Sequence, residues 1–187
     1  MISTDGISDE QKATVKFQAA YADMMGKLTA PGFIAALCAH EGAHLVYYEM
    51  MGPIRYESLP PRLEYSPEKQ AFTGHFAAIK LAEEPLCEPH KWQEYVTMMA
   101  HAHAAGGVVA RKLLPTCSGG DEVDKENFSK LCTDLINHFG GISIDVELCW
   151  KRAQDAVKRQ LEDDPHIMEM IQQRALELRP LFGFIME

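Results

Sequence analysis

The pattern that most constrains this chain is His40-Glu41-Gly42-Ala43-His44, which lies in a segment predicted to be helical. Two histidines four positions apart lie about one turn apart on the same helix face, with roughly 6 Å between their side-chain roots. Both imidazoles can therefore reach one metal ion. The flanking segments 33–37 and 45–48 are apolar, so we expect this helix to be largely buried. Buried histidines and a buried glutamate are costly unless a partner satisfies them.

The glutamate of this pattern adds chemistry to the pair of imidazoles. Glu41 would project beside the metal, where its carboxylate can take a proton from water. A His-Glu-x-x-His sequence on a helix is typical of zinc peptidases. We therefore predict Zn²⁺ as the cofactor, with His40 and His44 as ligands and Glu41 as the catalytic base. The alternative is a pair of hydrogen-bonded core histidines with an incidental glutamate.

Composition narrows the class of protein. The 187 residues are enough for one domain with a real core, and 47% of them are hydrophobic. The formal net charge is −9 with no basic cluster, so we expect no nucleic-acid partner. No apolar run approaches the roughly 18 residues that span a membrane, and the start does not resemble a signal peptide. The five cysteines contain no Cys-x-x-Cys pair, which is typical of reduced thiols in a cytoplasmic protein.

Apolar periodicity with helix-capping and helix-breaking residues predicts six helices. They are expected at about residues 9–27, 31–51, 89–114, 121–138, 143–161 and 165–178. Residues 53–82 differ, because prolines divide them into short segments and residues 72–76 alternate in polarity. This region predicts a small antiparallel sheet of two or three strands. The centre of the third helix is small-sided and ends in Gly106 and Gly107, which predicts close packing of another element there.

These pieces, taken in order, resemble the protease domain of the FtsH family of ATP-dependent zinc proteases. The shared features are the His-Glu-x-x-His helix, a strand region at 54–80, a Gly/Ala-rich helix centre at 104–107, and a glycine loop at 118–120 before an aspartate. Their order and approximate spacing hold across residues 31–180. The resemblance implies an α+β, mostly helical zincin-like domain with a small antiparallel sheet packed near the metal helix.

The resemblance also implies a single peptidase domain over residues 1–187. Within it, residues 1–30 would form an N-terminal helix, 31–140 the metal-site core and 141–187 the C-terminal helices. The chain contains no Walker-type nucleotide-binding loop and no membrane anchor, both of which the family carries. Family members assemble into rings, so a homo-oligomer and a separate ATPase partner are both compatible with the resemblance.

A third metal ligand is implied by the same resemblance, as an aspartate after the glycine loop. The candidates are Asp121 and Asp124. We favour Asp124 because its spacing from the glycine loop matches the family pattern. Phe128 and Leu131 then follow at i+4 and i+7, on an apolar helix face that could hold Asp124 toward the core. Asp121 would serve better as a helix N-cap, and it remains the alternative ligand.

The expected function is hydrolysis of peptide bonds in flexible polypeptides. The peptide or unfolded-protein substrate would lie extended as an added strand along Phe72, Thr73, Gly74, His75 and Phe76. The alternative is a metal-binding but catalytically weak or inactive domain that acts as a binding or regulatory module. A small helical structural protein without metal is a third reading, but it leaves Glu41 and the aspartate unexplained.

Several residues outside this set have simpler expected roles. His101 and His103 are two apart on a helix and point in different directions, so we expect packing or surface roles for them. Glu49 is expected at the surface rather than beside a ligand. Arg111 and Lys112 depart from the family, which usually has glutamates there.

Overall fold

The structure is a computed structural model that describes residues 8–52, 56–58, 62–75, 79–81, 87–116 and 121–181 of the chain. It is mostly helical, as expected. The helices are α1 (Asp9–Leu28), α2 (Phe33–Glu49), the short 3₁₀ helix η1 (Pro89–Lys91), α3 (Trp92–Leu113), α4 (Asp121–Phe139), α5 (Val146–Asp163) and α6 (Pro165–Leu178). Within the described ranges, no helix combines the length and the apolar character needed to cross a membrane.

Local capping residues set the ends of several helices. Ser8 and Gln11 form a capping box at the start of α1, with each side chain bonded to the other residue's backbone N–H. Asp164 caps α6, and Pro165 occupies its first turn. α2 begins two residues later than predicted, because Gly32 precedes it in a left-handed conformation with φ of 79°. α5 begins at Val146 because Asp145 is its N-cap, where its side chain accepts from the Leu148 N–H at 3.0 Å.

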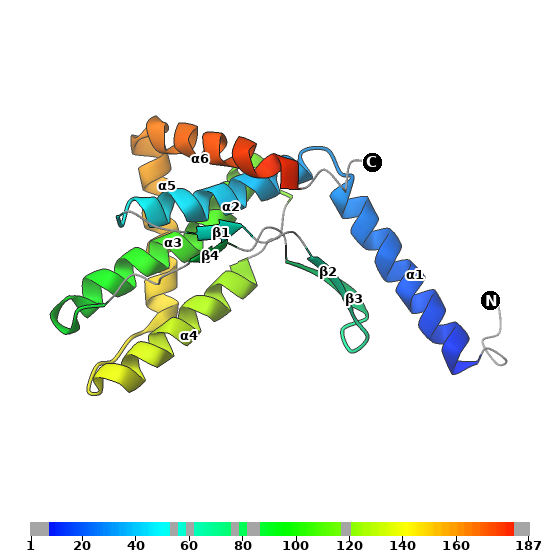
Figure 1. The fold of residues 1–187 in the computed structure, drawn as a ribbon, viewed down its shortest axis with the longest axis horizontal. Coiled ribbons are helices and arrows are strands. Elements are labelled where there is room, and N and C mark those ends of the chain that lie inside the picture. The colour runs from blue at the N-terminus through cyan, green and yellow to red at the C-terminus, as the bar shows by residue number, and fades with distance from the viewer. Residues whose placement is uncertain are drawn as a thin grey trace.

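The described strands form two separate antiparallel ladders instead of the single small sheet that we expected. β1 (Tyr56–Ser58) pairs with β4 (Ile79–Leu81), and β2 (Arg62–Ser66) pairs with β3 (Ala71–His75). The turn at 67–70 joins β2 to β3, and Gln70 in it has a positive φ of 49°. β3 also contacts α1. Figure 1 shows the β2–β3 hairpin on the same side of the molecule as α1. The position of a sheet over the metal helix stays a prediction.

The core lies among α2, α3, α4, α5 and α6. α2 packs against both α3 and α6, and α3 packs in turn against α4 and α5 (Figure 1). Fully buried side chains from three of these helices, Phe128, Val157 and Ile171, contribute about 1.5–3 kcal/mol each by leaving water. α1 stands apart from this body, and Leu28 at its end is its only buried residue. The predicted division of the chain into three parts stays a prediction.

Close backbone approach fixes α2 against α6. A Cβ at Gly42 would lie 2.9 Å from the Ile171 carbonyl oxygen and 3.1 Å from the Ala175 nitrogen. At the end of α2, Glu49 forms an ion pair with Arg174 of α6 at 2.7 Å. Glu49 was expected at the surface, but its side chain is only 33% exposed because Arg174 covers it. These contacts hold the helix that carries the His-Glu-x-x-His pattern.

Candidate metal centre

His40 and His44 lie one turn apart on α2, and both are buried, with 6% and 8% of their surface exposed. The apolar residues on either side of them are buried because α3 and α6 pack against α2, which confirms the expected burial. The two rings lie edge to face with centroids 4.7 Å apart, and their Nε2 atoms are 3.0 Å apart. Two buried imidazoles therefore direct the same ring atom at one point.

Asp124 brings a third ligand atom to that point from the first turn of α4. Its Oδ2 lies 3.2 Å from His40 Nε2 and 3.4 Å from His44 Nε2. Atoms bound about 2.1 Å from a tetrahedral zinc ion are about 3.4 Å apart. The three observed separations, 3.0, 3.2 and 3.4 Å, are close to three edges of one such tetrahedron. These three residues could therefore hold one metal ion and leave a fourth position open.

The hydrogen bonding of Asp124 also fits a cation. Asp124 Oδ2 is buried and has no hydrogen-bond partner within the described part of the chain, although both imidazole nitrogens contact it. A buried carboxylate oxygen without a donor is costly. A divalent cation among the two nitrogens and this oxygen would satisfy all three atoms, and two imidazoles with one carboxylate suit zinc.

A backbone carbonyl of α3 orients His44. The Nδ1 atom of His44 lies 2.7 Å from the Ala102 carbonyl oxygen. A carbonyl can only accept, so Nδ1 carries the proton and donates it. In the neutral ring the lone pair then lies on Nε2, the atom that faces His40 and Asp124. This partner fixes the ring in the orientation that a metal ligand needs.

Gly106 gives the two imidazoles their space on α3. A Cβ at this position would lie 2.5 Å from His44 Nε2 and 2.7 Å from His40 Nε2. Real Cβ atoms essentially never come this close, so any side chain at 106 would displace the rings. The close packing predicted for the small-sided centre of this helix is confirmed, and the element that packs there is α2.

Charges at the site are strongly coupled. Burial alone would raise the pKa of the Asp124 carboxyl, but the charge of His44 and the contacts of both imidazoles hold it well below its usual range. Burial has the largest single effect on the pKa of His44 and lowers it, but the charge and contact of Asp124, with smaller contributions from Glu41 and the Ala102 carbonyl, together raise it to about 9. Because histidine binds a metal ion through a deprotonated ring nitrogen, a metal ion competes with protons at this site.

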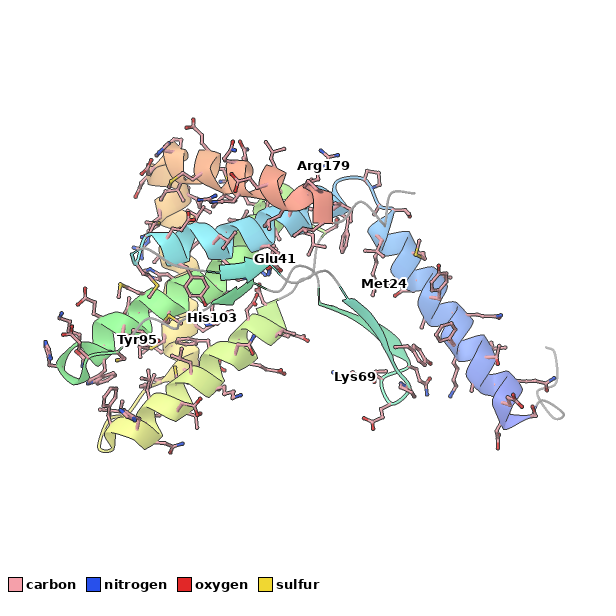
Figure 2. All side chains as sticks on the ribbon, viewed as in Figure 1. Met24, Glu41, Lys69, Tyr95, His103 and Arg179 are labelled. Atoms are coloured by element: carbon pink, nitrogen blue, oxygen red, sulfur yellow. The ribbon has the colours of Figure 1, made fainter. Side chains whose placement is uncertain are left out.

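Glu41 lies on α2 beside this group, and Figure 2 labels it on the face of α2 that looks toward the strands in that view. Its side chain is partly buried. Burial raises the pKa of Glu41 to about 8, with a smaller lowering effect from the charge of His44 and a raising effect from Asp124. A cation at the three ligands would lower this pKa again. Glu41 can therefore exchange a proton near neutral pH.

The alternative ligand Asp121 lies outside the metal-binding group. Its Oδ2 accepts hydrogen bonds from Arg111 Nη1 of α3 and, at 3.3 Å, from Gln154 Nε2 of α5. The Asp121 carboxylate lies directly over Gly107, where an added Cβ would overlap it. The N-cap role suggested for Asp121 is replaced by these contacts, because Asp121 is itself the first residue of α4. The geometry thus favours Asp124 as the third ligand.

His103 packs near the site but is not part of it. Its Nε2 lies 3.3 Å from the Tyr48 hydroxyl, and its ring lies 6.1 Å from that of Phe128. Figure 2 shows it between α3 and α4. Burial lowers the pKa of His103 to about 4, so the ring is neutral at pH 7. The packing role expected from the sequence is confirmed for this residue.

The predicted substrate strand is described only in part. Phe72, Thr73, Gly74 and His75 belong to β3, which pairs with β2 in the register Phe72↔Tyr65 to His75↔Arg62. Phe76 lies outside the described residues. Binding of a peptide along this strand stays a prediction.

Comparison with known proteins gives no family for this chain. No protein-family model, no curated protein and no solved structure matches it.

Proposed function

We propose that this chain is a zinc-dependent metallopeptidase that hydrolyses peptide bonds in flexible polypeptides. The observation that carries the proposal is the convergence of His40 Nε2, His44 Nε2 and Asp124 Oδ2 within 3.4 Å of one another, with Glu41 one residue from the first ligand. A pair of structural core histidines would need neither the unsatisfied aspartate oxygen nor the adjacent glutamate.

Each residue has a distinct task in this proposal. His40, His44 and Asp124 would hold the ion, and the Ala102 carbonyl keeps His44 in the ligand tautomer. When bound, zinc supplies Lewis-acid activation of water and of the scissile carbonyl at neutral pH. A Glu41 carboxylate oxygen accepts a proton from the attacking water and returns it to the leaving amine nitrogen.

The substrate is proposed to bind as an extended strand beside β3 in a zincin-like arrangement. Among the described strands, β3 pairs with β2 alone, so one of its edges has no strand partner. An unpaired edge offers alternating N–H and C=O groups that an extended peptide can use.

The proposed location is a reducing compartment such as the cytoplasm. The four described cysteines, Cys38, Cys87, Cys132 and Cys149, are free thiols, which supports this location.

The test combines metal content with peptide cleavage. We expect one zinc per chain in the wild type, none in His44→Ala or Asp124→Ala, and cleavage of an unfolded protein such as casein by the wild type. Glu41→Gln should keep its zinc and lose about 100- to 10,000-fold in cleavage rate. A Glu41→Gln protein that holds zinc and cuts at the wild-type rate would refute the catalytic role. Zinc binding without any cleavage by the wild type would instead support a binding or regulatory module.

A further inference from the structure

Three helices meet at Asp121, beside the metal group. Arg111 from α3 and Gln154 from α5 both donate to Asp121 Oδ2, at the start of α4. The pair is partly buried, with 35% of the Arg111 side chain and 21% of the Asp121 side chain exposed. The other oxygen, Oδ1, is buried and has no hydrogen-bond partner in the described ranges. The network is therefore more enclosed than an ordinary surface ion pair.

This network lies one helical turn from the third ligand. Asp121 and Asp124 are three residues apart in the first turn of α4, so they are neighbours on the helix surface. On α3, Gly107 seats Asp121 while the adjacent Gly106 seats the two histidines. Two adjacent residues of α3 thus contact both Asp121 of α4 and the two candidate histidine ligands of α2.

The metal group needs α4 in one register. Two ligands belong to α2, but Asp124 is the only ligand from α4. A small slide or rotation of α4 along α3 would carry Oδ2 away from its 3.2 and 3.4 Å separations. Metal sites require ligand distances correct to about 0.2 Å, so this register matters to affinity.

We infer that Arg111 and Gln154 hold Asp121 in order to position Asp124 for metal binding, which makes Arg111 and Asp121 positioning residues of the site. The inference rests on the proposed metal site and adds to it. The two aspartates of one helical turn have different tasks: Asp124 binds the ion, and Asp121 is kept from it by Arg111 and anchors the helix.

The direction in which zinc affinity changes when Arg111 is replaced separates a positioning role from a purely electrostatic one. If Arg111 acted only through its charge, removing it would strengthen the binding of a nearby cation. Positioning predicts the opposite, because α4 loses its anchor. Replacing a residue that orients a metal ligand typically weakens metal affinity about 10- to 100-fold.

The experiment measures zinc affinity by chelator competition, with the visible absorption of the Co²⁺-substituted protein as a report on ligand geometry. We expect Arg111→Met and Asp121→Ala each to weaken binding about 10- to 100-fold and to alter the Co²⁺ spectrum, while still binding one ion at saturation. The double variant should be no weaker than either single variant, because the two residues act as one unit. Asp121→Asn keeps an acceptor oxygen, so its zinc affinity should fall less than that of Asp121→Ala.

The control is Lys27→Met. Lys27 forms an ion pair with Asp23 at 2.7 Å within α1, a helix that carries none of the three candidate ligands. We expect wild-type zinc affinity and Co²⁺ spectrum in this variant.

The outcomes separate the inference from the proposed function. A wild type that binds no zinc would overturn both. Suppose instead that the wild type binds zinc and that Arg111→Met, shown by circular dichroism to be folded, binds zinc equally or more tightly. That result would overturn the positioning role and leave the proposed function standing. If Arg111→Met does not fold, the comparison of Asp121→Asn with Asp121→Ala decides, and equal losses in the two would overturn the role.

Discussion

A Gly106→Ala substitution adds one methyl group where the two histidines meet α3. The new Cβ would lie 2.5 Å from His44 Nε2 and 2.7 Å from His40 Nε2. Non-bonded heavy atoms need about 3.5 Å, so the ring nitrogens would have to retreat by roughly 1 Å. His44 cannot rotate freely to make this space, because its Nδ1–H donates to the Ala102 carbonyl.

The expected loss falls on metal affinity rather than on the fold. A shift of roughly 1 Å exceeds the tolerance of a metal site, about 0.2 Å, several times over. We expect zinc affinity to fall at least about 100-fold, which corresponds to about 2.7 kcal/mol. The metal-free protein gains about 1 kcal/mol from alanine in a helix interior and loses about 1–3 kcal/mol to crowding. Its unfolding free energy should therefore stay within about 2 kcal/mol of the wild type.

Gly26→Ala is the matched control for this change. Gly26 lies within α1, and a Cβ there would meet nothing within 4 Å. This variant should gain about 1 kcal/mol in urea unfolding of the metal-free protein and keep the wild-type zinc affinity. Chelator competition measures the affinity of all three proteins. A folded Gly106→Ala protein that binds zinc as tightly as the wild type would show that the rings do not rest on Gly106, and the site geometry would be wrong.

Three further predictions concern stability. Gly42→Ala places a Cβ 2.9 Å from the Ile171 carbonyl oxygen, so in urea unfolding it should be about 1–3 kcal/mol less stable than Gly26→Ala; equal stability would contradict the close α2–α6 contact. The folded-state pKa of His103 is lowered to about 4, so its stabilising effect is complete above its unfolded pKa of about 6.5 and is lost as pH falls toward 4. Between pH 7 and pH 5, the unfolding free energy of metal-free His103→Gln should therefore fall by about 2 kcal/mol less than that of the wild type, and equal falls in urea unfolding at the two pH values would contradict the burial of His103. Zinc at 100 times its dissociation constant should stabilise the wild type by about 2.7 kcal/mol, an effect that a chelator reverses and that His44→Ala lacks.

Local signals made the helices predictable. The capping box of Ser8 and Gln11 and the Asp164-Pro165 start of α6 act within a few residues, so they can be read directly from the chain. The strand region was harder, because strand pairing depends on contacts between distant residues. β1 pairs with β4 across the β2–β3 hairpin, and nothing in the alternation of residues 53–82 distinguishes two ladders from one sheet.

The site was predictable to the extent that its geometry is local. His40 and His44 share a face by helical spacing alone, and the structure brings their Nε2 atoms together. Asp124 lies 80 residues further along, and only a resemblance to a known family suggested it. The Ala102 carbonyl that orients His44 could not have been found, because every residue has a backbone carbonyl and only the packing of α3 against α2 selects this one. The identity of the metal and the role of Glu41 stay predictions.

The adjacent glycines of α3 explain how the candidate ligands from two helices meet at one point. Successive residues on a helix face directions about 100° apart, so Gly106 and Gly107 open two neighbouring strips of its surface. α2 fills the first with His40 and His44, and α4 fills the second with Asp121. Larger residues at either position would separate α2 or α4 from α3, and the distance between His44 and Asp124 would grow. Although α3 supplies none of the three candidate side-chain ligands, it therefore sets the distance between the histidines of α2 and Asp124 of α4.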